Sequence, residues 1–158
     1  MPRDKLKVVA TAAGAGEPAQ ADATYVLGDQ VGFLMRVAMQ RHTAIFMSRM
    51  PEGLTQTQFA ALARLHEVGP CSQNHLGRLI YLDAATIKGV VDRLRARDLV
   101  TAMPDPNDRR RHAVTLTERG RAVTQEARNV AAEITAATLA PLTLDEQQAV
   151  VKLLKKLG

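Results

Sequence analysis

The sequence contains no tryptophan, and aromatic residues make up only 3% of its 158 positions. So few rings argue against a surface that stacks single-stranded nucleic acid and against an aromatic cage for a cationic ligand. The single cysteine, Cys71, excludes an intramolecular disulfide and is typical of a protein of the reducing cytoplasm. No run approaches the roughly 18 apolar residues of a membrane-spanning helix, so no membrane partner is expected.

Motifs of catalysis are missing as well. The chain has no G-x-S-x-G, no phosphate-binding P-loop, no G-x-G-x-x-G and no H-E-x-x-H. Four side chains could serve a metal: His42, His66, Cys71 and His75. A closed zinc site needs four tetrahedral ligands, and no second spaced pair accompanies Cys71 and His75. We therefore expect a protein that is not an enzyme and has no cofactor; metal sensing stays as an alternative.

The charge balance is basic. Lysine and arginine number 21 against 16 acidic residues, which gives a net charge of +5 and a pI of about 9.8. A domain this basic favours a polyanionic partner. Residues 1–24, rich in alanine, glycine and proline, have no sustained period and are predicted to be a flexible tail.

Hydrophobic spacing and capping residues predict a mainly helical chain. A helix is predicted from Leu27 to about Met50, with two apolar stripes that make a surface wider than one core contact needs. The pairs Thr55/Gln58 and Thr143/Glu146 have the spacing of capping boxes. Three further helix starts carry a capping residue: Ser72, Asp83 and Thr117.

A β-hairpin is predicted between the fourth and fifth of these helices. Its strands are expected over 99–103 and 112–116, and its tip carries the consecutive arginines Arg109, Arg110 and Arg111. The helix that starts at Thr117 should end before Pro141.

Two short helices joined by a tight bend, the second with a small, polar, basic outer face, indicate a helix-turn-helix. Thr86 and Lys88 would then face base edges in the major groove, and the small residues Ala84 and Ala85 would allow close approach to the duplex. The hairpin would supply a wing whose arginines reach the minor groove. Taken alone, each of these charged surfaces could also be ordinary solvated surface.

The motifs together resemble the MarR family of winged helix-turn-helix regulators. The resemblance covers about residues 27–157 and rests on L-T-Q-T-Q-F-A-A-L at 54–62, G-P-C-S-Q at 69–73, D-A-A-T-I-K-G-V-V-D-R-L at 83–94, D-P-N-D-R-R at 105–110 and L-T-E-R-G at 116–120. One departure is Asp98, where the family commonly has glycine, although aspartate tolerates a left-handed backbone better than most residues.

The resemblance implies a homodimeric DNA-binding repressor with a winged helix-turn-helix fold. Residues 25–53 would form a dimerisation helix, 54–117 the DNA-binding domain and 118–158 the C-terminal dimerisation helices. Asp108 matches the acid that steadies the wing. The full set of expected DNA-binding residues is Ser72, Gln73, Asn74, Ala84, Ala85, Thr86, Lys88, Arg93, Arg109, Arg110 and Arg111.

Family members commonly release DNA when a small aromatic acid binds between the dimerisation and DNA-binding parts. The segments 40–46 and 69–77 are similar to the subgroup that regulates catabolism of nicotinic acid and related hydroxylated aromatic acids. Phe33, Arg36 and His42 are the expected ligand contacts, because an arginine fork can hold a carboxylate. The alternatives are a metal- or redox-responsive regulator, with Cys71 as the reactive group, and a non-specific architectural DNA-binding protein.

Overall fold

A computed structural model of the chain describes residues 25–158, and the predicted tail over 1–24 lies outside the described residues. The described part has six α-helices and one two-stranded antiparallel sheet, which confirms the predicted mainly helical class with a hairpin. In chain order the elements are α1 (Val31–Arg49), α2 (Gln56–Val68), α3 (Gln73–Leu79), α4 (Ala84–Ala96), β1 (Val100–Pro104), β2 (His112–Leu116), α5 (Glu118–Leu139) and α6 (Leu144–Leu157).

The predicted helix starts are confirmed by their capping bonds. The Thr55 hydroxyl accepts from the Gln58 backbone N–H at 3.2 Å, and the Gln58 side chain accepts from the Thr55 N–H at 3.1 Å. Thr143 and Glu146 form the same reciprocal pair at the start of α6. Ser72, Asp83 and Thr117 cap α3, α4 and α5 through single backbone N–H groups. These bonds satisfy donors that a helix cannot pair internally.

Two boundaries differ from the prediction. Leu27–Asp29 is a separate 3-10 turn, and Gln30 has an extended backbone, so α1 begins only at Val31. The first strand is shifted by one residue, because Leu99 belongs to the turn after α4: its N–H donates to the Leu94 carbonyl. Pro104 can end β1 because each strand of a two-stranded sheet is an edge, where a missing N–H is tolerated.

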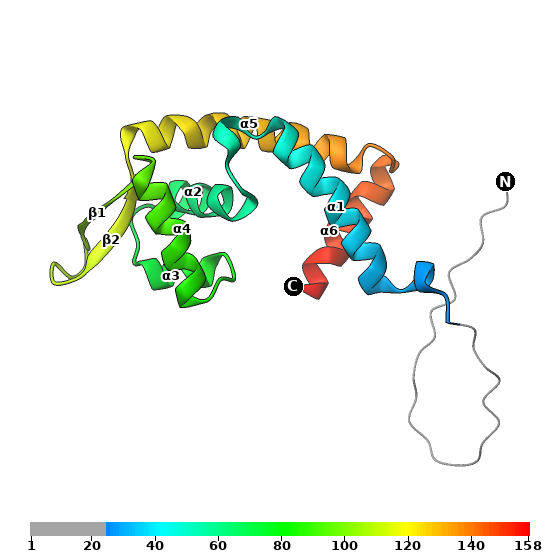
Figure 1. Cartoon of the computed structure of the whole chain (residues 1–158), viewed down its shortest axis with the longest axis horizontal. Coiled ribbons are helices and arrows are strands. Elements are labelled where there is room, and N and C mark those ends of the chain that lie inside the picture. The colour runs from blue at the N-terminus through cyan, green and yellow to red at the C-terminus, as the bar shows by residue number, and fades with distance from the viewer. Residues whose placement is uncertain (1–24) are drawn as a thin grey trace, which may run out of the picture.

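The long helix α5 joins the two ends of the molecule (Figure 1). One end holds α2, α3, α4 and the hairpin, and the other holds the N-terminal part of α1 together with α6. A continuous apolar cluster fills the first end; its fully buried members include Leu54, Leu62, Leu76, Ile87 and Leu94. α5 approaches this end closely at Gly120, where a Cβ atom would lie 1.9 Å from the carbonyl oxygen of Leu99.

The far end leaves apolar side chains uncovered within one chain. None of the residues of α6 is buried, and Leu153, Leu154 and Leu157 are 56%, 52% and 72% exposed. On α1, Val31, Leu34, Val37 and Met47 of the predicted double stripe are exposed, and so are Met35 and Met39, which lie outside it. Among the helices of residues 25–158, none combines the length and apolar character that a membrane crossing requires.

Candidate nucleic-acid interface

The bend between α3 and α4 is tight because the two helices nearly touch. A Cβ atom on Gly77 would lie 3.1 Å from both the Leu82 carbonyl oxygen and the Ile87 side chain. The Leu82 N–H donates to the Gly77 carbonyl at 2.9 Å, and Tyr81 turns the chain with a left-handed φ of 58°. The pair therefore has the compact geometry of a helix-turn-helix.

α4 separates its apolar and polar side chains cleanly. Ile87, Val90, Val91 and Leu94 are buried, as their spacing predicted. The remaining side is exposed and carries five of the expected DNA-binding residues: Ala84, Ala85, Thr86, Lys88 and Arg93. The residues predicted to read bases thus lie on one accessible helix face.

Asp83 organises the start of this helix. Its carboxylate accepts from the Thr86 backbone N–H at 2.8 Å and from the Thr86 hydroxyl at 2.7 Å. These bonds, the backbone one first, hold the pKa of Asp83 below its ordinary value. The Thr86 hydroxyl therefore donates to Asp83 in the free protein, and its oxygen remains available as an acceptor.

Lys88 is also held by a carboxylate. Its ammonium lies 2.6 Å from Asp92, although the Lys88 side chain is 67% exposed. The hydrogen bond from Lys88 lowers the pKa of Asp92. Arg93 lies back along the helix, with a guanidinium nitrogen 3.4 Å from where a Cβ of Gly89 would stand. A Cβ at Gly89 would therefore make ordinary van der Waals contact with the Arg93 guanidinium.

The N-terminus of α3 places Asn74 in the open, while Ser72 and Gln73 are half-buried. Arg78, one helical turn after Asn74, was missed by the sequence reasoning. It lines one hollow with Asn74 and Ala84 and another with Ser72 and the wing residue Asn107. Its spacing of four residues from Asn74 could have identified it as a cation on the same face.

The hairpin tip is ordered by Asp108. Its carboxylate accepts from the Arg110 backbone N–H at 3.0 Å and lies 3.4 Å from the Arg111 guanidinium. Within the described chain, the side chains of Arg109 and Arg110 have no hydrogen-bond or ion-pair partner. The hairpin lies beside α3 and α4 (Figure 1), and its tip carries these two guanidinium groups.

Cys71 lies next to the wing, where its backbone exchanges two hydrogen bonds with the backbone of Val114 in β2, as in an antiparallel β-bridge. Burial raises the pKa of the Cys71 thiol, and the Asp105 carboxylate raises it further. A thiol kept protonated is a poor nucleophile, which argues against the redox alternative. Among residues 25–158, no three His, Cys, Asp or Glu side chains are placed to hold a metal ion.

A separate cavity of about 290 Å³ lies where α1, α2 and α5 meet. Its lining consists of His42, Phe46, Gln56, Phe59, Ala131, Ile134 and Thr135. The His42 Nδ1 is 2.9 Å from the Thr138 hydroxyl, which fixes the ring and leaves Nε2 for another partner. Phe46 stands 6.2 Å from the rings of both His42 and Phe59. The cavity therefore combines aromatic walls with a few polar groups, the usual make-up of a small-molecule site.

The structure brings only one of the three expected ligand contacts to this cavity. His42 lines it, whereas Arg36 lies 5.1 Å from the centre of the Phe33 ring and neither residue is part of the lining. Sequence reasoning missed the α2 and α5 residues of the lining. Local periodicity carries no signal for them, because they meet α1 only through tertiary packing.

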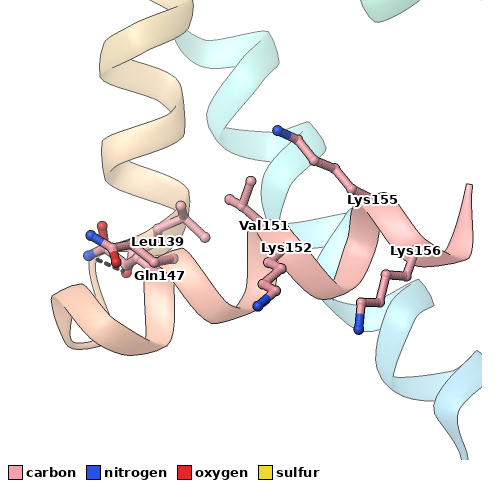
Figure 2. A pocket seen from close by; sticks show the side chains of 7 residues that line it. Leu139, Gln147, Val151, Lys152, Lys155 and Lys156 are labelled. Carbon is pink, nitrogen blue, oxygen red and sulfur yellow. Dashed lines mark hydrogen bonds between the residues drawn. The ribbon is translucent and has the colours of Figure 1, made fainter.

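A larger hollow of about 600 Å³ lies against α6, with Leu139 and Val151 as apolar lining (Figure 2). The Gln147 amide is already used, because it donates to the carbonyls of Leu139 and Leu142. Lys155 points to one side of α6, while Lys152 and Lys156 point to the other. The three ammonium groups do not converge on one position, so the hollow offers no built anion site.

A helix-turn-helix with an exposed basic face and an arginine-tipped wing defines a winged helix-turn-helix DNA-binding transcriptional regulator, and not an enzyme. Comparison with known proteins gives the particular family. Residues 54–112 match the model of the MarR family. The chain is 42% identical over 134 residues to the transcriptional repressor NicR of Pseudomonas putida. The alignment covers 84% of this chain and 85% of NicR. The chain belongs to the MarR family.

Solved structures agree with this assignment. A probable transcriptional regulator from Pseudomonas aeruginosa is 50% identical and superposes with a TM-score of 0.81, over 84% of this chain and all of that one. BpsR of Bordetella bronchiseptica, whose DNA binding is regulated by 6-hydroxynicotinic acid, is 42% identical with a TM-score of 0.79. That match covers 85% of this chain and 97% of BpsR. The predicted winged helix-turn-helix class is confirmed.

Proposed function

We propose that the protein is a homodimeric repressor that a small aromatic acid releases from its operator. Two copies would join through α1, α5 and α6 and place two α4 helices in successive major grooves of a pseudo-palindrome. Half-sites would then lie about one helical turn, ~10 bp, apart. Such a regulator acts where the DNA is, so we assign it to the cytoplasm.

The single observation that carries the effector proposal is the cavity at His42. It lies between the helices proposed to dimerise, α1 and α5, and α2 of the DNA-binding end. Its volume of about 290 Å³ is near the lower end of the ~300–1,000 Å³ of ligand sites, which suits a single-ring acid. Since DNA binding by the relative BpsR responds to 6-hydroxynicotinic acid, a hydroxylated nicotinate is the ligand class we favour.

Release follows from linkage. A ligand that contacts both α1 and α2 binds best to one relative placement of the two ends. If that placement separates the two α4 helices by a distance that does not match the operator half-sites, the ligand and the operator favour different conformations of the dimer, and each weakens binding of the other. A coupling of about 1–3 kcal/mol would weaken operator binding by roughly 5- to 150-fold.

The test uses 6-hydroxynicotinic acid as the probe. We expect it to raise the thermal midpoint of the full-length protein and to lower its affinity for a duplex selected from a random library. The variant His42→Gln should lose both responses while still binding the duplex, because it removes an aromatic ring of the cavity wall. His66→Gln, at an exposed position of α2 outside the lining, is the matched control and should respond like the wild type.

Two outcomes would contradict the proposal. If the acid neither raises the thermal midpoint of the wild type nor releases it from DNA, hydroxylated nicotinates are not the effector. A His42→Gln variant that responds fully places the ligand elsewhere. Arg36→Ala tests the predicted carboxylate contact separately, and an unchanged response would remove Arg36 from the site.

A further inference from the structure

The connection between α1 and α2 contains a glutamate in an unusual conformation. Glu52, in the 3-10 turn Pro51–Gly53, has φ 54° and ψ 17°. Only a few per cent of non-glycine residues adopt a positive φ, and glutamate is not among those enriched there. Met50 and Leu54 on either side are buried, so the turn is anchored at both ends. What glutamate adds at this position, compared with glycine, is its side chain.

That side chain binds two arginines from distant elements. The Glu52 carboxylate accepts from Arg119 with both oxygens, at 2.9 and 2.8 Å. Arg97 donates to the Glu52 carbonyl at 2.7 Å and to its carboxylate at 3.3 Å. Arg119 also donates to the Arg97 carbonyl at 3.0 Å, which closes the cluster. Charge-assisted bonds of this kind fix geometry as well as contribute energy.

The cluster joins three elements. Arg97 is the C-terminal cap of α4, the proposed recognition helix, and Arg119 lies in the first turn of α5. These two segments are already fixed to each other, because the Thr117 hydroxyl donates to the Asp98 carbonyl at 2.7 Å. Glu52 attaches the pair to the end of α1. The end of α4 therefore has a direct polar link to the chain that leaves the dimerisation helix.

We propose that Glu52 is a positioning residue for operator recognition, one that sets the angle between α4 and the dimerisation helices. This role rests on the proposed binding of two half-sites by a homodimer. The angle of α4 determines the separation of the two recognition helices, and hence the half-site spacing that the dimer accepts. The cluster is about one-third exposed at Glu52, and such surface ion pairs contribute little to overall stability. Its loss should therefore change spacing selectivity more than folding.

The experiment compares spacing selectivity with half-site affinity. Full-length wild type first selects a two-half-site duplex from a random library. Affinity is then measured for that duplex, for versions with one base pair added or removed between the half-sites, and for a single half-site. We expect Glu52→Gln to reduce the preference for native spacing by about tenfold, the scale of coupling within one ion-pair network. Its single half-site affinity should remain unchanged.

Glu67→Gln is the matched control, since Glu67 pairs at 2.7 Å with Arg64 inside α2 and makes no ion pair with another element among residues 25–158. It should retain the native spacing preference. Arg119→Met removes the other side of the same ion pair and should give the same result as Glu52→Gln. Unchanged selectivity in both cluster variants overturns the positioning role, as does equal loss of half-site and two-site binding. A wild type with no spacing preference overturns the two-half-site function itself, and this role with it.

Discussion

At the scale of single residues, the exposed face of α4 is already arranged before any partner binds. Asp83 holds the Thr86 hydroxyl, and Asp92 holds the Lys88 ammonium at 2.6 Å. In the proposed complex a phosphate would compete with Asp92 for the Lys88 ammonium, whereas the Thr86 oxygen could accept a bond from a base while its hydroxyl still donates to Asp83. The guanidinium groups of Arg109 and Arg110 have no such partner in the described chain, so in the proposed complex they would meet DNA without that competition.

Arg110→Ala tests the wing at this scale. Removing a free guanidinium that enters a narrow minor groove should weaken binding of the selected duplex by about tenfold. Among the described residues its side chain makes no hydrogen bond or ion pair, so the thermal midpoint should not fall. Fluorescence anisotropy and differential scanning fluorimetry measure the two quantities.

Arg128→Ala is the control for Arg110→Ala, because Arg128 is an exposed arginine on α5 outside the wing and the helix-turn-helix. It removes the same charge and should reduce affinity far less. Equal losses in the two variants would mean that only net charge matters, as in a non-specific architectural protein.

At the scale of elements, local patterns determine most of what was predictable. Each cap, at Thr55, Ser72, Asp83, Thr117 and Thr143, acts within a few residues of its own position, so its chemistry can be identified directly from the sequence. The left-handed backbone at Asp98, with φ 55°, agrees with the family resemblance, in which glycine is common at this position. The break at Gln30 was missed because the apolar stripe continues through Leu27, although hydrogen bonding does not.

Contacts between elements were not predictable in the same way. His42 meets Thr138 across 96 positions of sequence, and Glu52 meets Arg119 across 67. Periodicity shows which face of a helix is apolar but not which helix will cover it. The exposed polar face of α4 and the arginines of the hairpin tip could be located from the sequence because each lies within one local element. The cavity could not, since three separate helices contribute to it.

The cap at Asp83 gives a prediction about pH for the α4 helix. Because folding lowers the pKa of Asp83, its contribution to stability is fully present above the unfolded value of about 3.9. It is lost as pH falls through the lower folded value. Asp83→Asn should keep the cap but remove this part of the acid dependence, and Asp83→Ala should lower the thermal midpoint by a few degrees at neutral pH.

Thermal melts of the three proteins across the acid range measure the effect of Asp83. Asp145→Asn, an exposed aspartate in the first turn of α6 outside the capping bonds of that helix, is the control. If the Asp83→Asn variant shows the same acid dependence as the wild type, the carboxylate of Asp83 does not contribute to it.

At the scale of the whole molecule, one end of the described chain leaves apolar side chains exposed that a single copy does not cover. One end has a dense core, whereas α6 leaves Leu153, Leu154 and Leu157 more than half exposed. Apolar side chains gathered on one helix mark an interaction surface. The N-terminal part of α1, which carries the exposed Val31 and Leu34, lies at the same end of the molecule, so one partner copy could cover both helices (Figure 1).

Leu157→Asp tests whether a second copy covers this surface. Within one chain Leu157 is 72% exposed, so the aspartate should leave the fold of each chain intact. In a dimer it would bury a charge without a partner, which is strongly unfavourable. Light scattering should then give a mass near the 17.2 kDa of one chain. Binding of the two-half-site duplex should fall by about 10²-fold or more, because the two half-sites no longer bind as one event.

The control for Leu157→Asp is Val68→Asp, which places the same charge at an apolar side chain 47% exposed on α2, away from α1 and α6. Its mass should stay at twice that of one chain. A wild type of single-chain mass that still binds the duplex tightly would contradict the dimer. A Leu157→Asp variant that remains dimeric would instead place the contact on α1 and α5, and the same substitution at Leu34 would then be expected to separate the copies.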